Sequence, residues 1–131
     1  MEKPGGFMIL IDTNIFIDHL RNYQPAIEFF KSASKRDDVL FSAITEAELL
    51  AGSANNEQKK REILLQFLSY WRKIHVTNPI AVLAGDLSRE YKLLIPDAII
   101  AASAIINKAE LVTRNINDFK HVKELKVSSP Y

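Results

Sequence analysis

The stretch "FMILIDTN", residues 7–14, places five consecutive apolar residues before a carboxylate, Asp12. A short apolar run of this kind is typical of a strand that is buried on both faces, as strands of parallel sheets are. We therefore predict a strand over residues 7–12 that ends on a charge. An aspartate there commonly starts a turn, because its side chain accepts hydrogen bonds from backbone N–H groups just ahead of it. The position gains functional interest if other predicted strands end near carboxylates in the same way.

Beyond this strand, short β-rich runs alternate with longer helical patterns of apolar residues. Further strands are predicted at residues 39–44, 73–77, 110–113 and 125–129. Helices are predicted at residues 14–22, 24–35, 45–52, 57–73, 79–91, 95–109 and 117–122. Because parallel neighbours need crossover connections, this alternation indicates an α/β fold with a mainly parallel sheet.

The composition limits the class of protein. With 131 residues and 47% hydrophobic content, the chain is long enough for one well-buried domain. It contains no cysteine, which excludes disulfides and thiolate chemistry and suits a reducing cytoplasm. The net charge of +1 gives no whole-molecule field that would attract nucleic acid or a membrane. We predict a flexible leader over residues 1–7, a single domain over residues 8–131, a cytoplasmic location and no membrane span.

Several common functional motifs are missing from the sequence. The glycine fingerprint of dinucleotide sites and the P-loop are both absent, and no serine has the sequence pattern of a hydrolase nucleophile. The three histidines, His19, His75 and His121, share no spacing typical of metal ligands, so we interpret them as surface or core residues. Any metal site must therefore use oxygen ligands.

Carboxylates follow several of the predicted strands. Asp12 ends the first strand, Glu48 lies one turn into the next predicted helix, and Asp97 starts the apolar helix at residues 95–109. Asp118 or Asn115 follows the fourth strand. In open α/β sheets, ligands bind outside the carboxyl ends of the strands. We therefore expect these side chains to meet in one cleft.

Three of these acids also have a purely structural interpretation. Asp12 fits an Asx-turn. Asp97 fits the positive end of a helix dipole, and Asp118 fits an N-cap position. Taken singly, each residue is therefore weak support for catalysis.

Glu48 has a structural interpretation of its own. The stretch "TEAE", residues 45–48, fits a capping box in which Thr45 is the N-cap residue and Glu48 reaches back to it. Glu46 is a rival carboxylate in the same turn, but it lies about 200° away around the helix. At most one of the two glutamates is therefore expected to face the cleft.

Four segments, taken together, resemble the signature segments of the PIN-domain family. They are "ILIDTNIFIDHL" (9–20), "FSAITEAELLAG" (41–52), "IPDAIIAASAI" (95–105) and "LVTRNINDF" (111–119), and they occur in the family's order and at about its spacing. The resemblance extends from residue 8 to about residue 129. It is particularly close to the small bacterial and archaeal VapC-type toxins.

The resemblance implies a three-layer α/β/α sandwich with a mainly parallel sheet of about five strands. It also implies an endoribonuclease that binds Mg²⁺ or Mn²⁺ and leaves 5′-phosphate and 3′-hydroxyl ends. The family's metal-binding acids correspond to Asp12, Glu48 and Asp97. For the fourth catalytic acid, Asn115 stands where many members have Asp. Asp118, three residues further on, shares a helical face with it and is the candidate replacement, which leaves Asn115 a supporting role.

The resemblance gives further residues supporting roles. Thr13 and Asn14 are expected to steady the turn after the first strand. Thr113 is expected to hydrogen-bond Asp12 or a water on the metal. Arg114, beside the site, is the candidate RNA-binding residue.

Partners are implied by the same resemblance. VapC-type toxins are commonly homodimers and are held inactive by a small antitoxin protein whose tail covers the acidic cleft. The apolar stripes at residues 24–33, 57–71 and 80–91 are candidate surfaces for these partners, with packing into the core as the default interpretation.

Two alternative functions stay open at this point. Asn115 at the fourth acidic position is compatible with a catalytically inactive PIN-like binding module. The sequence is also compatible with a nuclease of RNA maturation or decay that is not a toxin. A phosphatase with an aspartyl nucleophile is less compatible, because "DTN" lacks a second aspartate two residues after the first.

Overall fold

The computed structural model describes residues 8–131, so the predicted leader at residues 1–7 lies outside the described residues. In this part of the chain, five strands form one sheet in the order β3-β2-β1-β4-β5, and every neighbouring pair is parallel. They are β1 (Met8–Ile11), β2 (Val39–Ser42), β3 (Arg72–Ile74), β4 (Ala109–Val112) and β5 (Val127–Ser128). The predicted parallel α/β sheet is confirmed, with the strand that contains residues 8–11 at its centre.

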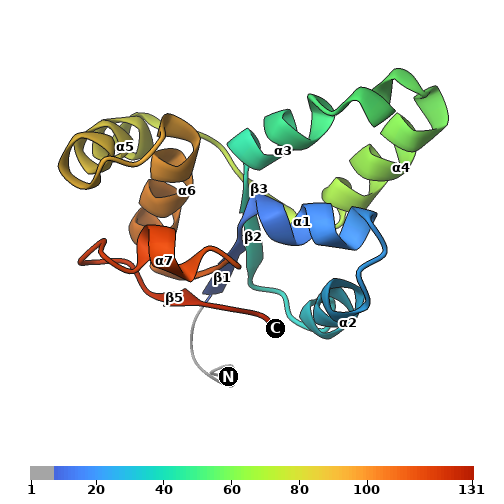
Figure 1. Cartoon of the computed structure of the whole chain (residues 1–131), viewed down its shortest axis with the longest axis horizontal. Coiled ribbons are helices and arrows are strands. Elements are labelled where there is room, and N and C mark those ends of the chain that lie inside the picture. The colour runs from blue at the N-terminus through green and yellow to red at the C-terminus, as the bar shows by residue number, and fades with distance from the viewer. Residues whose placement is uncertain (1–7) are drawn as a thin grey trace.

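Within residues 8–131, seven α-helices and one short 3₁₀ helix connect the strands. They are α1 (Thr13–Leu20), α2 (Gln24–Ala33), α3 (Ala43–Leu50), η1 (Ser53–Asn56), α4 (Gln58–Ser69), α5 (Asn78–Tyr91), α6 (Ile95–Ile106) and α7 (Ile116–Phe119). Figure 1 shows α5, α6 and α7 on one side of the sheet and α1, α2, α3 and α4 on the other. The expected three-layer α/β/α sandwich is therefore confirmed.

The central position of β1 explains why its sequence is apolar throughout. Leu10 packs with α5 and α6, whereas Ile9 and Ile11 pack with α1 and α2 on the opposite face. Successive side chains of a strand point to opposite faces, so a strand covered on both sides has no position for a polar residue. The first polar side chain comes only where the strand ends, at Asp12.

Helix α6 is buried almost all round, as its apolar composition predicts. Its buried residues are Ala98, Ile100, Ala101, Ala102, Ser103 and Ala104. Small side chains let the helix lie close to the sheet and to α5. This packing fixes the position of the first turn of α6, which contains Asp97.

Most helix boundaries differ from the prediction by one or more residues, and the differences at α4 and α3 have clear physical reasons. Helix α4 ends at Ser69, so the buried Trp71 lies beyond it, and Ile63 on the predicted stripe is 55% exposed. Helix α3 starts at Ala43 because Ser42 is its N-cap residue, with Ser42 Oγ accepting a hydrogen bond from the Ile44 N–H at 3.1 Å. The start predicted at residue 45 is therefore wrong.

None of the helices within residues 8–131 combines the length and the apolar character that crossing a membrane requires.

Candidate active site

Asp12 lies at the carboxyl end of the central strand and is the N-cap residue of α1. Its Oδ1 accepts a hydrogen bond from the Thr13 N–H, and its Oδ2 accepts one from Thr113 Oγ1, both at 2.8 Å. The side chain is only 4% exposed. A carboxylate that is buried and held through both oxygens has a fixed orientation, which a flexible surface acid would not have.

Thr113 connects β4 to β1. Besides donating to Asp12, its Oγ1 accepts hydrogen bonds from Asn14 Nδ2 at 3.3 Å and from the Asn115 N–H at 3.0 Å. Asn14 Oδ1 also accepts from the Arg114 N–H at 3.5 Å. The expected hydrogen bond from Thr113 to Asp12 is present, and Asn14 holds the segment after β4 against the start of α1.

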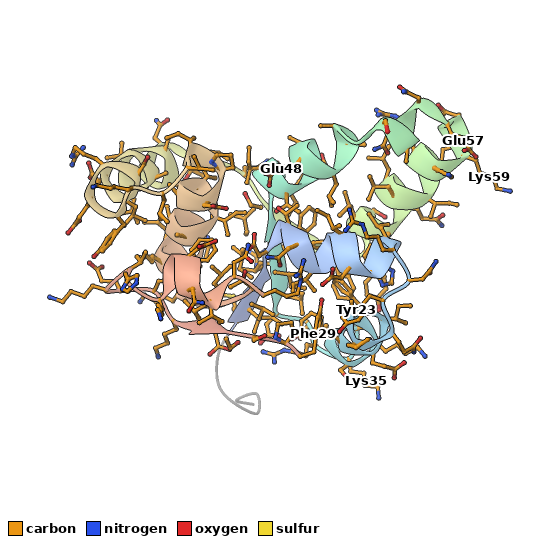
Figure 2. All side chains as sticks on the ribbon, viewed as in Figure 1. Tyr23, Phe29, Lys35, Glu48, Glu57 and Lys59 are labelled. Carbon is orange, nitrogen blue, oxygen red and sulfur yellow. The ribbon has the colours of Figure 1, made fainter. Side chains whose placement is uncertain are left out.

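Glu48 accepts a hydrogen bond from Thr13, which is bonded in turn to Thr45, and it does not take part in a capping box. Thr13 Oγ1 donates to Glu48 Oε1 at 2.8 Å and lies 2.8 Å from Thr45 Oγ1. Because a hydroxyl has one proton, Thr13 gives it to the carboxylate and accepts a hydrogen bond from Thr45. Ser42 caps the helix instead, so the predicted capping role of Thr45 and Glu48 is wrong. Figure 2 shows Glu48 on the part of α3 that lies near α1.

The rival glutamate in the same turn points elsewhere. Glu46 Oε2 forms an ion pair with Lys73 Nζ at 3.1 Å, at the edge of the sheet formed by β3. This confirms that no more than one of the two glutamates faces the cleft.

Asp97 lies in the first turn of α6 and is partly buried. Burial raises the pKa of Asp97, and the negative charges of Glu48 and Asp118 raise it further. Asp118 is exposed and lies within α7; its N–H donates to the carbonyl of Asn115 at 3.0 Å. Asn115 occupies the N-cap position, so the predicted N-cap role of Asp118 is wrong, and Asp118 is the acid of this segment whose charge acts on Asp97.

The pKa of Asp12 depends on the charges of the other acids in the cleft. Burial raises the pKa of Asp12 from 3.8 to about 6, although the hydrogen bonds from Thr113 and from the Thr13 N–H lower it. The charges of Asp97 and Glu48 add to the rise. Residues far apart in the sequence therefore converge, and their mutual repulsion means that the cleft favours positive charge.

The donor set fits a hard divalent cation. All the side chains that converge are carboxylates, the ligands that Mg²⁺ and Mn²⁺ prefer. Within residues 8–131, no three potential ligands stand close enough to enclose an ion by themselves. Mg²⁺ usually keeps several waters and is bound through one or two carboxylates, so an open acidic cleft of this kind suits it. A cation would also remove the repulsion that raises the pKa of both aspartates.

The histidines contribute nothing to this cleft. His19 stacks on Phe67 with ring centroids 4.3 Å apart, and His75 and His121 are exposed at other places on the surface. Their interpretation as surface or core residues is confirmed.

Arg114 extends from the cleft along α1. Its Nε forms an ion pair with Asp18 Oδ2 at 2.6 Å, and its side chain is 44% exposed. Sequence reasoning found Arg114 but missed Asp18, and it gave Thr45 a capping role in place of its contact with Thr13. The letters around Asp18, in "IFIDHL", contain no signal of a partner almost a hundred residues away.

Next to the cleft, a groove of about 590 Å³ runs between α1, α3, η1 and α4. Its apolar walls include Ile17, Leu20, Leu49, Ile63 and Leu64, and its charged residues are Arg21, Glu48 and Lys60. Glu48 therefore belongs both to the acidic cleft and to this groove.

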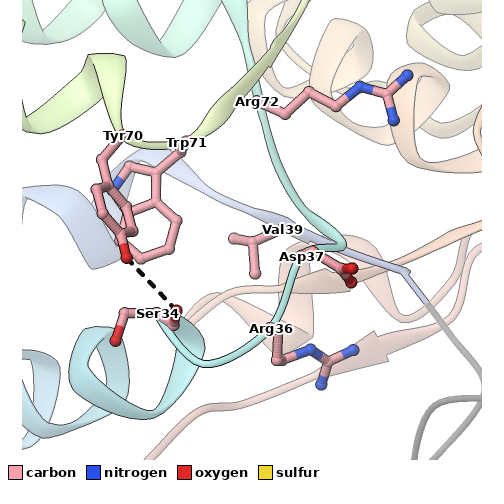
Figure 3. Close-up of a pocket in the computed structure, with 7 residues that line it drawn as sticks. All are labelled: Ser34, Arg36, Asp37, Val39, Tyr70, Trp71 and Arg72. Atoms are coloured by element: carbon pink, nitrogen blue, oxygen red, sulfur yellow. Dashed lines mark hydrogen bonds between the residues drawn. The ribbon is translucent and has the colours of Figure 1, made fainter.

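A second pocket, of about 240 Å³, lies at the opposite edge of the sheet. Figure 3 shows its lining, which includes Arg36 and Val39 near the start of β2 and Arg72 at the start of β3. Ligands of parallel α/β sheets bind at the carboxyl ends of the strands, and this pocket lies at the amino ends. It contains none of the predicted site residues.

Comparison with known proteins agrees with this geometry. The PIN domain family model matches residues 9–125. A curated relative, ribonuclease VapC10 of Mycobacterium tuberculosis, is 32% identical over 124 residues, which cover 91% of each chain. The chain belongs to the PIN-domain family.

Solved structures lead to the same family. A toxin–antitoxin complex from Klebsiella pneumoniae contains a chain that is 34% identical, with a TM-score of 0.77 over 94% of this chain and 98% of that one. VapBC2 from Rickettsia felis, bound to a DNA fragment from its promoter, contains a chain that is 25% identical, with a TM-score of 0.80 over 92% and 97%. The resemblance to VapC-type toxins drawn from the four sequence segments is confirmed.

Proposed function

We propose that this protein is a divalent-metal-dependent endoribonuclease, carried by a single PIN-like domain over residues 8–131, and that it is the toxin of a toxin–antitoxin pair. The observation that carries the proposal is the convergence of Asp12, Glu48, Asp97 and Asp118, whose charges act on one another across the carboxyl ends of β1, β2 and β4. The ribonuclease name of the curated relative supports the substrate class.

Asp12, Glu48 and Asp97 hold the cation in this proposal, directly or through the waters that such an ion usually keeps, and Asp118 completes the acidic site in place of Asn115. Mg²⁺ is the favoured ion and Mn²⁺ an alternative, because both prefer oxygen ligands. A divalent ion there supplies positive charge to the transition state and makes a water acidic enough to act as the nucleophile.

The remaining residues keep this arrangement in place. Thr113 and the Thr13 N–H fix both oxygens of Asp12, and Thr13 holds one oxygen of Glu48. Asn14 ties the segment after β4 to α1, so Arg114 stays beside the cleft, where it binds RNA phosphate. Asn115 supports the same segment through its N–H on Thr113.

The decisive experiment is cleavage of single-stranded RNA by purified protein with Mg²⁺, with Mn²⁺ and with EDTA. Asp97→Asn should lower the metal-dependent rate by roughly 100-fold or more, because several kcal/mol of transition-state stabilisation depend on the bound ion. Asp86→Asn is the matched control, because Asp86 on α5 is exposed and pairs only with Arg89 in the described structure. Circular dichroism checks that both variants are folded.

The possible outcomes separate the candidate functions. Equal activity of Asp97→Asn and the wild type would overturn the assigned site. A folded wild type that binds neither ion and cuts no RNA would favour the inactive binding module. Growth arrest on expression, rescued by a small neighbouring gene, distinguishes a toxin from a nuclease of RNA maturation.

We also propose that the antitoxin occupies the groove beside the cleft. The structural neighbours are toxin–antitoxin complexes, and the groove offers the apolar walls that a partner helix needs. Glu48 would pair with a basic residue of the antitoxin, and Arg21 and Lys60 with acidic ones. Ile63→Asp should then abolish rescue by the antitoxin while RNA cleavage persists, and unchanged rescue would contradict this placement.

The proposal also includes that the protein forms a homodimer and acts in the cytoplasm. Val82, Leu94 and Ile95 are 67%, 74% and 54% exposed, so α5 and the start of α6 present apolar surface that the monomer leaves open. Light scattering behind a sizing column measures the mass. A monomer across the micromolar range would contradict the dimer.

A further inference from the structure

The guanidinium of Arg114 is fixed by contacts that cleavage chemistry alone does not require. Asp18 Oδ2 lies 2.6 Å from Arg114 Nε and accepts a hydrogen bond from the Tyr131 hydroxyl at 2.5 Å. One carboxylate oxygen thus holds a cation from the segment after β4 and a phenol from the segment after β5. The Asp18 side chain is only 13% exposed, so its carboxylate is mostly shielded from solvent.

Tyr131 is itself held in place. Its ring packs edge-on against Tyr23 with centroids 5.5 Å apart, and Ser129 Oγ donates to its carbonyl at 2.9 Å. Burial raises the pKa of the Tyr131 phenol far above its ordinary value, and the hydrogen bond to Asp18 raises it further. The hydroxyl therefore keeps its proton and remains a donor at any physiological pH.

Two residues on one face of α1 contact the backbone and the side chain of Arg114. Asn14 and Asp18 are four residues apart, so they lie on the same side of the helix. Asn14 Oδ1 accepts from the Arg114 N–H, and Asp18 pairs with the Arg114 side chain. Asp18 lies about 9 Å along the helix axis from Asp12, because each residue advances the helix by about 1.5 Å. The guanidinium is thus beside the acidic cleft and outside it.

An RNA backbone needs a cation at this place. The carboxylates of the cleft repel a polyanion, and a divalent ion held by them would offset that repulsion mainly close to itself. A guanidinium carries five N–H donors, and at 44% exposure Arg114 has donors left for a phosphate besides its contact with Asp18. An arginine that is already oriented loses less side-chain entropy on binding than a free one.

We propose that Asp18 and Tyr131 are positioning residues that hold Arg114 against α1, so that its guanidinium binds an RNA phosphate adjacent to the one that is cut. This inference rests on the proposed ribonuclease function. It assigns a role in substrate binding to Tyr131, which lies outside the four signature segments of the sequence.

The test is steady-state cleavage of a fluorogenic single-stranded RNA in Mg²⁺. Tyr131→Phe keeps the ring and removes only the hydroxyl, so KM should rise about three- to tenfold with kcat within about twofold. Arg114→Ala should raise KM about tenfold or more and reduce the salt dependence of log KM by about 0.7, the value for one phosphate contact on a single strand. Tyr70→Phe is the control, because within residues 8–131 that hydroxyl has only the Ser34 carbonyl as a hydrogen-bond partner.

The double variant separates positioning from general stability. If Tyr131 acts through Arg114, Tyr131→Phe should leave KM unchanged in the Arg114→Ala background. An equal rise of KM in both backgrounds, or no rise with Arg114 present, overturns the inference. A wild type that cuts RNA with a KM indifferent to Tyr131→Phe overturns only this inference. A wild type that cuts no RNA overturns the proposed function and this inference with it.

Discussion

At the scale of single residues, the acidic cleft is held together by hydroxyl groups. Thr13 and Thr113 each donate to a different carboxylate, and Thr45 donates to Thr13. Such short, uncharged donors orient acids without neutralising them, which leaves the negative charge available to a cation. A lysine or arginine in the same places would occupy the site that the cation needs.

The buried carboxyl group of Asp12 makes the stability of the metal-free protein depend on pH. Its folded pKa, about 6, lies above the value of 3.8 for an ordinary aspartate. Between these values the folded chain binds more protons than the unfolded chain, so stability falls as the pH rises through this interval. The change amounts to about 3 kcal/mol at most. Asp12→Asn should remove this part of the pH dependence.

Urea unfolding in EDTA at pH 4.5 and pH 7.5 measures the effect. The wild type should lose more stability than Asp12→Asn between the two conditions. The comparison isolates Asp12, because the raised pKa of Asp97 acts in the same direction in both proteins. Parallel losses in the two proteins would show that Asp12 titrates normally.

The residues of the site were predictable in identity and only partly in role. Asp12, Glu48 and Asp97 follow from strand ends and from the resemblance, and the structure brings their charges together. The capping role of Thr45 was a wrong prediction, because "TEAE" fits a capping box equally well when the helix has already begun. The local sequence does not show whether a threonine caps its own helix or faces a neighbouring helix.

At the scale of elements, the residue that caps α3 and the residue of α3 that faces the cleft are different residues at different positions. Ser42 caps the helix, and Glu48, nearly two turns further on, faces the cleft. Ser42→Ala should therefore lower the free energy of unfolding by about 1 kcal/mol with metal affinity unchanged. Glu48→Gln should do the reverse, keeping stability within about 0.5 kcal/mol and weakening Mn²⁺ binding about tenfold or more.

Calorimetric Mn²⁺ titration and urea unfolding of both variants check this separation. Each variant serves as the control for the other. Loss of stability and of Mn²⁺ affinity together in Glu48→Gln would return Glu48 to a structural role.

The type of each element was more predictable than its boundaries. Long apolar stripes identified α5 and α6 correctly, because those stripes pack into the core over their whole length. The predicted helix at residues 57–73 was too long, because the chain leaves the helix after Ser69 and still buries Trp71. An apolar residue that is buried just beyond a helix looks, in the sequence, the same as one that is buried within it.

At the scale of the whole molecule, the metal site should act as a ligand-dependent reinforcement of the fold. A cation that binds only the folded chain stabilises it by about 2.7 kcal/mol at 100 times its Kd. Mg²⁺ should therefore raise the midpoint of thermal unfolding at pH 7.5, and the rise should be much smaller in Asp97→Asn. Differential scanning fluorimetry with Mg²⁺ and with EDTA provides the measurement.

An equal rise in the wild type and in Asp97→Asn would mean that the ion binds elsewhere. Asp86→Asn is again the control, because its carboxylate is exposed and pairs with Arg89 on the same helix.

The parallel α/β class of the fold follows from the alternation of strand and helix patterns and the three-layer sandwich from the family resemblance, whereas the strand order does not follow from the sequence pattern. The order β3-β2-β1-β4-β5 depends on which crossovers pass over which face, and that is decided by packing between segments distant in sequence. The same limit applies to the groove and to the contact of Tyr131 with Asp18, which no local pattern announces.

The central position of β1 has a consequence for synthesis of the protein on the ribosome. Asp12 emerges early, but its partner Thr113 is 101 residues further along the chain. At a translation rate of about 5–20 residues per second, the two are separated by roughly 5–20 s of elongation. Until β4 is made and pairs with β1, the nascent chain contains no assembled cleft, so a ribosome making this nuclease is not exposed to its activity from the unfinished chain.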